Sequence, residues 1–157
     1  MEPKIGVTEK GRRAVADGLS AVLADTYTLY LKTQNFHWNV TGPHFKHYHE
    51  MFGEQYEALA DANDEIAERI RALGFHAPGS FKAFLALKGI DEAGDNVPDA
   101  DEMVRQLTAD NESLSVRARK VLETAQNVGD EVTGDMMIAR MTAHDKTAWM
   151  LRASLTN

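Results

Sequence analysis

The chain is 157 residues long, 43% of its residues are hydrophobic, and it contains no cysteine. That length suits one domain with a hydrophobic core, and the lack of cysteine excludes disulfides, thiolate metal sites and cysteine nucleophiles. The net charge of −7 argues against a surface that binds nucleic acid all over, because phosphates are neutralised by clustered lysine and arginine.

The N-terminal residues 1–8 are expected to form a short tail ahead of the first helix. The layout Met1-Glu2-Pro3-Lys4 lacks the charged and then apolar order of a signal peptide. No hydrophobic run in the chain approaches the roughly 18 residues that can span a bilayer. We therefore expect a cytoplasmic protein that does not associate with membranes.

Two long helices are predicted in the first half of the chain. Hydrophobic residues recur with a helical period over residues 10–38, which form the first helix. Gly42-Pro43 then breaks the chain, with Thr41 as the expected cap and Pro43 in the first turn of the next helix. The second helix runs to about Leu73, and the two helices form an antiparallel hairpin. The expected buried stripe of the second helix comprises Phe45, Phe52, Tyr56, Leu59, Ile66 and Ile70.

Residues 77–96 are expected to cross over to a second pair of helices. Ser80 can cap a short helix, residues 81–87, which is apolar on more than one side and so predicts a subunit contact. The third long helix is predicted from about Pro98 to Asn127, where Gly129 stops it. Four long helices with one long crossover indicate an all-α, ferritin-like four-helix bundle in a single domain, residues 1–157.

The fourth long helix is expected to begin at Asp130, which can cap it. Its expected buried side comprises Val132, Met136, Met141, His144, Ala148, Leu151 and Leu155. A di-iron centre inside such a bundle uses Glu-x-x-His pairs, and neither the third nor the fourth helix contains one. We therefore expect no metal in the interior and interpret His144 as a core residue whose ring nitrogens are satisfied.

The candidate metal ligands lie between residues 37 and 68. Asp64 and Glu68 are four residues apart, so one helical face can present both carboxylates to a single point. His37 lies near the end of the first helix, and His49 lies near the start of the second. Two imidazoles with two carboxylates favour iron, manganese or zinc over calcium.

A single chain is not expected to bring these four ligands together. His49 and Asp64 are 15 residues apart on one predicted helix, which separates them by roughly 22 Å. Either the histidines and the carboxylates serve different sites, or the carboxylates of one subunit face the histidines of another. We favour the shared site because the helical period turns Asp64 and Glu68 away from the core, although an ordinary solvated acidic face is the competing interpretation.

The stretch Asn35-Phe36-His37-Trp38-Asn39-Val40, followed by Gly42-Pro43, His49 and Asp64-x-Ile66-Ala67-Glu68-Arg69, resembles the signature of the Dps family. These ferritin-like mini-ferritins are named as DNA-binding proteins of starved cells. The resemblance continues through residues 77–80 to Trp149 and so covers nearly the whole chain. It implies a hollow homo-dodecamer in which His37, His49, Asp64 and Glu68 form a ferroxidase centre shared between two subunits.

The resemblance also implies the chemistry. Fe(II) would be oxidised, with hydrogen peroxide preferred over dioxygen, and Fe(III) mineral would be stored inside the shell, which protects DNA from oxidative damage. Each centre could hold two iron ions, with zinc as a substitute. Trp38 would lie beside the metals, where its indole could assist by donating an electron; an interface anchor is the alternative role.

Further carboxylates and histidines have two interpretations each. By resemblance, Glu131 and Asp135 would line three-fold ion channels that concentrate ferrous ions, with Asp130 at the mouth. Their alternative role is to complement the dipole of the fourth helix. His44 and His47 are expected to be solvated, with an additional metal near the centre as the alternative.

Two other functions are compatible with the sequence. A DNA-coating, nucleoid-associated protein would bind DNA through its N-terminal tail, but this tail is short, and Glu2 and Glu9 dilute its basic residues. A metal-buffering shell would hold zinc without redox turnover. Trp149 is expected to be a packing residue in any of these proteins.

Overall fold

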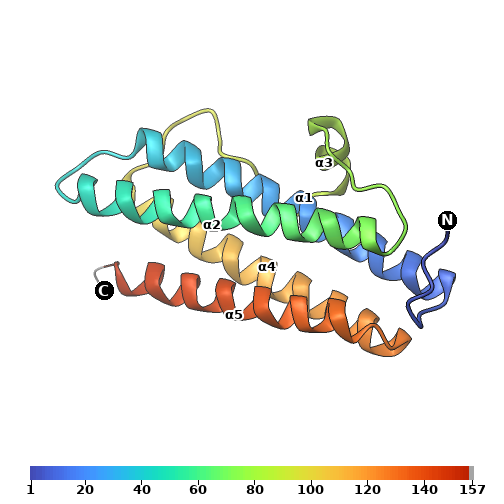
Figure 1. The fold of residues 1–157 in the computed structure, drawn as a ribbon. Coiled ribbons are helices and arrows are strands. Elements are labelled where there is room, and N and C mark those ends of the chain that lie inside the picture. Colours follow the sequence, from blue (N-terminus) through green and yellow to red (C-terminus); the bar gives the residue numbers. More distant parts are fainter. Residues whose placement is uncertain (156–157) are drawn as a thin grey trace.

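The structure, a computed structural model, describes residues 1–155 and contains five helices in that range. They are α1 (Glu9–Asn39), α2 (Phe45–Ala72), α3 (Phe81–Leu87), α4 (Ala100–Val128) and α5 (Glu131–Ala153). α1 and α2 form one antiparallel hairpin, α4 and α5 form another, and the crossover between them carries α3 along α1 (Figure 1). The predicted all-α, ferritin-like bundle with a short extra helix in the crossover is confirmed.

Most helix ends follow from local sequence signals. Ser80 and Asp99 cap α3 and α4 by accepting hydrogen bonds from the backbone N–H three residues later, at 3.1 and 2.8 Å. Gly129 ends α4 in the left-handed conformation, with φ at 74°, and Asp130 then caps α5. The α4 start was predicted two residues early, at Pro98.

The predicted start of α2 was wrong. Thr41 does not cap the helix, and Pro43 lies before it, because α2 begins at Phe45 with His44 as its N-cap residue. Gly42 adopts φ of 114°, and its carbonyl oxygen accepts a hydrogen bond from Phe45 N at 3.1 Å. This turn uses residues 42–45, so the helix starts later than the Gly-Pro pair suggests.

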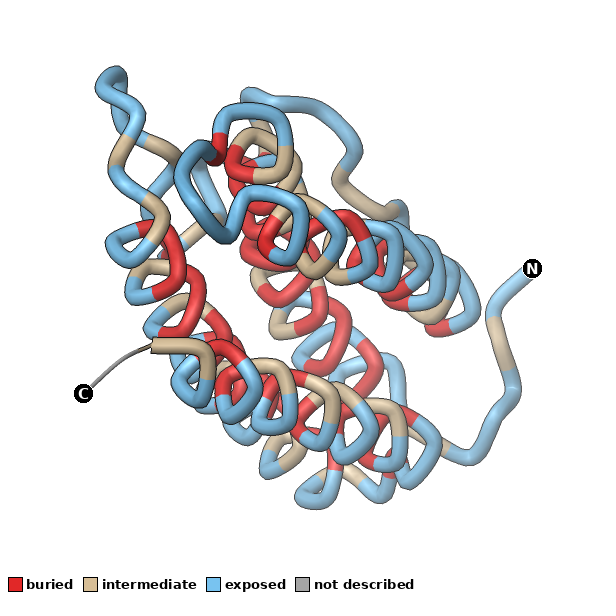
Figure 2. Tube along the Cα trace, turned by 90° about the vertical axis from the view of Figure 1, so that its left-hand side faces the viewer, coloured by how far each residue is buried: buried red, intermediate tan, exposed pale blue. Residues whose placement is uncertain are grey.

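The core lies along the axis shared by the four long helices, whose buried faces turn toward one another (Figure 2). Its largest fully buried side chains include Leu19, Leu29, Phe36, Phe52, Ile66, Ile70, Leu107, Leu114, Met137 and Leu151. Two residues predicted to be buried are exposed, Phe45 at 44% and Val132 at 62%. Both lie in the first turn of their helices, and the buried face of α5 is instead the one that carries Thr133, Met137 and Met141.

The crossover is fastened to the bundle by two buried charges on α1. Asp25 accepts hydrogen bonds from the N–H groups of Gly89 and Ile90 at 2.6 and 3.1 Å. Lys32 pairs with Asp110 at 2.8 Å and donates to the crossover backbone at Asp91. These contacts hold the crossover, and with it α3, against α1. Phe84 of α3 is buried, whereas Phe81 and Leu85 are exposed, so α3 carries more apolar side chains than its own subunit buries, as predicted.

Within residues 1–155, no helix is long and apolar enough to cross a membrane.

Candidate metal centre

His37 and His49 face each other across the α1–α2 hairpin. Their rings stack with centroids 3.8 Å apart and planes inclined by 17°. His37 Nδ1 lies 2.5 Å from the carbonyl oxygen of His49, and His49 Nδ1 lies 2.8 Å from the carbonyl oxygen of His37. Because a carbonyl oxygen only accepts hydrogen bonds, each Nδ1 carries the proton and donates it.

This reciprocal arrangement decides what the other ring nitrogens can do. With Nδ1 protonated, a neutral imidazole has an unprotonated Nε2 whose lone pair can bind a metal ion. Backbone carbonyls commonly orient metal-binding histidines in this way. The two half-buried rings of the histidine pair, His37 and His49, are therefore held in the tautomer that leaves Nε2 available to a metal ion.

Two residues on α2 hold the His37 ring in place. Gly53 is buried in the middle of the helix, and a Cβ atom added there would lie 3.2 Å from His37 Cε1 and Nδ1. Glycine in a helix interior costs about 0.5–1 kcal/mol relative to alanine, so the close approach of the ring accounts for its presence. The Tyr56 ring contacts His37 edge-on at 5.2 Å. The sequence analysis missed Gly53, although a glycine within a periodic helix signals close approach.

Asp64 and Glu68 are exposed on α2, as predicted, and lie one helical turn apart. Within residues 1–155, neither carboxylate forms an ion pair or a side-chain hydrogen bond. α2 runs unbroken from Phe45 to Ala72, so the 15 residues from His49 to Asp64 span about 22 Å. No three metal-binding side chains converge anywhere in the described part of the chain. One subunit therefore holds two separated pairs of candidate ligands.

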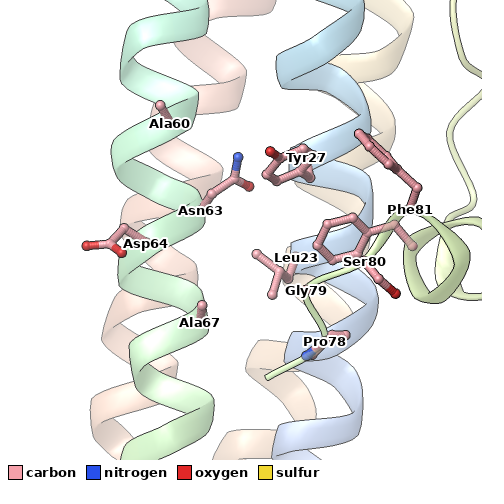
Figure 3. Close-up of a pocket in the computed structure, with 11 residues that line it drawn as sticks. Leu23, Tyr27, Ala60, Asn63, Asp64, Ala67, Pro78, Gly79, Ser80 and Phe81 are labelled. Carbon is pink, nitrogen blue, oxygen red and sulfur yellow. The ribbon is translucent and has the colours of Figure 1, made fainter. Parts of the chain in front are cut away.

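A pocket of about 400 Å³ lies beside Asp64, between α1, α2 and the segment that leads into α3 (Figure 3). Tyr27 and Phe84, which stack at 4.9 Å, contribute to its apolar wall. Asn63 points toward Tyr27, and its Oδ1 is buried without a hydrogen-bond partner. Exposed Phe81 lies at the same pocket, so an apolar surface lies beside Asp64, whose carboxylate points away from the pocket (Figure 3).

The three carboxylates at the start of α5 have different environments. Glu131 and Asp135 are exposed. Asp130 is only 2% exposed and accepts hydrogen bonds from the N–H and hydroxyl of Thr133. Its carboxylate also pairs with Arg69 of α2 at 2.7 Å. This geometry argues against the expectation that Asp130 lies at a channel mouth, because its oxygens join α5 to α2.

The remaining aromatic and histidine candidates lie on the surface of the subunit. Trp38 follows His37 directly and is 61% exposed, and His44 and His47 are exposed near the start of α2. Trp149 is also largely exposed, so packing within its own subunit is not its role. An interface role stays a prediction for Trp38.

His144 contrasts with the histidine pair because it is buried in the bundle, as predicted. Its Nδ1 lies 2.8 Å from Asn111 Oδ1, and its Nε2 lies 3.3 Å from the Arg140 guanidinium, which can only donate. Burial, with a smaller contribution from the Arg140 charge, lowers the pKa of His144 to about 3. The ring is therefore neutral at physiological pH, and protein groups occupy both nitrogens.

Comparisons with known proteins agree with this architecture. The ferritin-like domain family matches residues 16–157. The chain is 41% identical over 143 residues to DNA protection during starvation protein 2 of Bacillus anthracis, covering 91% of this chain and 97% of that protein. It is 39% identical to an uncharacterized low temperature-induced protein of Nostoc, covering 95% of this chain and 84% of that protein.

Solved structures show the same likeness. The Dps protein of Vibrio cholerae, described as a member of a superfamily of ferritin-like diiron-carboxylate proteins, superposes with a TM-score of 0.93 at 32% identity, over 99% of this chain and 97% of that one. The Dps structure of Staphylococcus aureus gives a TM-score of 0.87 at 35% identity, over 91% of this chain and 95% of that one.

Proposed function

This chain belongs to the Dps family of ferritin-like proteins, and on that premise we propose that it is a ferroxidase and iron-storage protein. It oxidises Fe(II), with hydrogen peroxide as the preferred oxidant, and stores Fe(III) mineral inside a dodecameric shell. Removal of iron and peroxide together protects DNA from oxidative damage. The Vibrio cholerae relative, a ferritin-like diiron-carboxylate protein, supports iron as the metal.

The observation that carries this proposal is the separation of the two ligand pairs on one subunit. Within residues 1–155, the histidine pair presents two Nε2 atoms without a protein partner, and Asp64 with Glu68 presents two unpaired carboxylates about 22 Å away along α2. A two-fold dimer uses the same patch of both subunits, so it can place the histidine pair of each copy against the carboxylate pair of the other. Each dimer then contains two complete centres.

The apolar surface beside Asp64 supports the same assembly. The pocket between α1, α2 and α3 is open in the isolated subunit and is lined by exposed Phe81, and Leu85 of the same short helix is also exposed. Large apolar side chains grouped on a monomer surface commonly mark a protein interface. We assign this face to a second copy, which would cover the pocket that Phe81 and Asn63 line.

The proposed ligands suit the chemistry of iron oxidation. Imidazole and carboxylate groups bind ferrous iron, and few protein ligands leave positions for water or peroxide. The negative carboxylates favour the ferric product. One peroxide accepts one electron from each of two ferrous ions and two protons, which gives two ferric ions and two water molecules without a hydroxyl radical. Trp38, exposed next to His37, can supply an electron if only one ferrous ion is present.

The ions need a route to these centres. Glu131 and Asp135, one turn apart and exposed at the start of α5, form an acidic patch that attracts ferrous ions. We propose that they line the channel through the shell. Zinc prefers the same ligand types and would compete with iron at the histidine and carboxylate pairs.

A complementation experiment tests whether the centre is shared. His37→Ala and Asp64→Ala shells should each assemble but oxidise iron slowly. If the two variants are denatured, mixed and reassembled, a heterodimer has one centre with the intact histidines of one subunit and the intact carboxylates of the other. Random mixing should therefore restore about one quarter of the wild-type centres.

His47→Ala and Glu57→Ala are matched controls, because both remove exposed side chains from the same helix as the ligands. These controls should keep the wild-type rate of peroxide-driven iron oxidation. Mixed shells that stay as slow as the parent variants would refute the shared centre. Wild-type rates in both parent variants would refute the residue assignment itself.

Coating of DNA is the competing function, and the contacts of a basic residue at the start of α1, next to the tail, count against it. Arg12 is buried, pairs with Glu2 at 2.5 Å and donates to the carbonyl of Leu73, so this basic side chain is not free to bind phosphate. We expect binding, if any, only through the N-terminal tail. A gel shift at physiological salt should leave DNA unretarded, and a retarded band would favour the coating function.

A further inference from the structure

A second pocket, of about 280 Å³, lies between α2 and α5 on a side of the bundle that the proposed iron ligands do not use. Asn111 of α4 and His144 of α5, both buried, lie at its floor. Arg140 and Lys146 of α5 bring two cations to its wall, and Glu54 of α2 brings one carboxylate. The pocket therefore has an excess of positive charge in a chain whose net charge is −7.

Arg140 is the unusual member of this α2–α5 pocket. Among the described residues, its Nε is buried without a hydrogen-bond partner, and one terminal nitrogen lies 3.3 Å from Nε2 of the neutral His144 ring. Within residues 1–155, no carboxylate lies within ion-pair distance of this guanidinium. Burial lowers the pKa of Arg140, and the more distant Glu65 only partly offsets that effect.

A half-buried guanidinium without a counter-charge is energetically unfavourable, because desolvation is not repaid by an ion pair. Other buried charges in the described part of the subunit form ion pairs that offset the cost of their desolvation. Lys32 has Asp110, and Asp25 has Arg117. Arg140 instead lines the α2–α5 pocket without an ion-pair partner within residues 1–155, and a planar guanidinium is the group best suited to bind an oxyanion there.

We propose that the α2–α5 pocket binds a small oxyanion of the phosphate type, with the Arg140 guanidinium as its main contact and Lys146 as the second cation. A bound anion would offset the cost of desolvating Arg140, midway along α5. A cation is excluded by the two positive side chains. This pocket contains none of the proposed iron ligands, so its occupancy and the ferroxidase proposal can fail independently.

The test uses inorganic phosphate and the assembled, metal-free protein. Isothermal titration calorimetry should show saturable binding of one phosphate per subunit, and thermal unfolding should shift to higher temperature as phosphate is added. Sulfate should act similarly, whereas chloride at equal ionic strength should not. Arg140→Gln should weaken phosphate binding roughly 10- to 100-fold, because a charge-assisted contact is lost.

Arg119→Gln is the matched control, since Arg119 is exposed on α4 and outside the pocket. This variant should bind phosphate as wild type does. If Arg140→Gln does not assemble, Lys146→Gln tests the same pocket from an exposed position and should weaken binding by a smaller factor. The proposal is overturned by wild-type protein that shows no saturable phosphate binding, or by equal losses in the Arg119 and Arg140 variants.

Discussion

His37 and His144 are both histidines on long helices, but their surroundings prepare them for opposite roles. His37 donates from Nδ1 to a carbonyl oxygen, and Nε2 has no protein partner within the described residues. His144 has Asn111 on one nitrogen and Arg140 on the other. The number of ring nitrogens left free, rather than burial alone, separates a candidate metal ligand from a structural histidine.

The same contrast holds for the aspartates. Asp64 is exposed and unpaired within residues 1–155, whereas Asp130 is buried with Thr133 and Arg69 as partners. Both lie on helices that carry many other charges. A polar side chain that has hydrogen-bond or ion-pair partners inside the subunit stabilises the fold. A polar side chain without such partners is available to a metal ion or to a second copy of the chain.

The largest expected effect is the loss of stability in acid caused by His144. Its folded-state pKa of about 3 lies below the ordinary value of 6.5, so between these values the unfolded chain binds a proton that the folded chain does not. The stabilising contribution is complete above pH 6.5 and is lost as the pH falls toward 3, by roughly 5 kcal/mol in all.

His144→Gln removes this titration and therefore checks it. Urea unfolding at pH 7 and pH 5, at one protein concentration, should show a wild-type loss of stability that exceeds the loss in the variant by about 2 kcal/mol. At neutral pH, His144→Gln should oxidise iron at the wild-type rate. Equal pH dependence in the two proteins would show that His144 does not titrate in this window.

A smaller free-energy effect, but a large kinetic one, is expected at the histidine pair. His49→Ala removes a proposed ligand and should slow iron oxidation by at least about 100-fold, because loss of outer-shell partners alone costs 10- to 100-fold. The unfolding free energy should change by less than about 1.5 kcal/mol, since one half-buried hydrogen bond is lost. A variant with normal oxidation kinetics would place His49 with His144 among the structural histidines.

The smallest expected effect comes from Gly53→Ala, which leaves every ligand in place. The new Cβ would lie 3.2 Å from His37 Cε1 and Nδ1, so the ring must shift by tenths of an ångström. We expect roughly tenfold weaker binding of Co(II), followed by its visible absorption spectrum, with helix stability unchanged or raised by up to about 1 kcal/mol.

Gly134→Ala is the control for that substitution, because its Cβ would meet only Leu122, at 3.4 Å. It should leave Co(II) binding unchanged. If both variants bind Co(II) as wild type does, Gly53 does not position the His37 ring.

Features that depend on a few neighbouring residues were predictable from the sequence. Ser80 and Asp130 cap their helices, and Gly129 ends α4, because each acts within one helical turn. The α2 start was not predictable, since the turn at Gly42 depends on the conformation of the whole hairpin loop.

Contacts between distant segments limited the prediction of the candidate site. The spacing of His37, His49, Asp64 and Glu68, with the resemblance to the Dps family, predicted these residues as ligands. The reciprocal hydrogen bonds of the histidine pair could not be predicted, because they require two backbone carbonyls placed by the folded hairpin. Asp130 shows the same limit. Its cap is local, whereas its pairing with Arg69 joins two helices that no local pattern relates.

Because α2 is unbroken, it fixes the spacing between the two pairs of candidate ligands. A helix is stiff over the 15 residues between His49 and Asp64. The rise per residue therefore fixes the distance between the histidine pair and the carboxylate pair of one subunit. Loops elsewhere can lengthen during evolution without changing that interval. A single inserted residue between His49 and Asp64 would instead turn the acidic pair by about 100° around the helix axis, away from the opposing histidines.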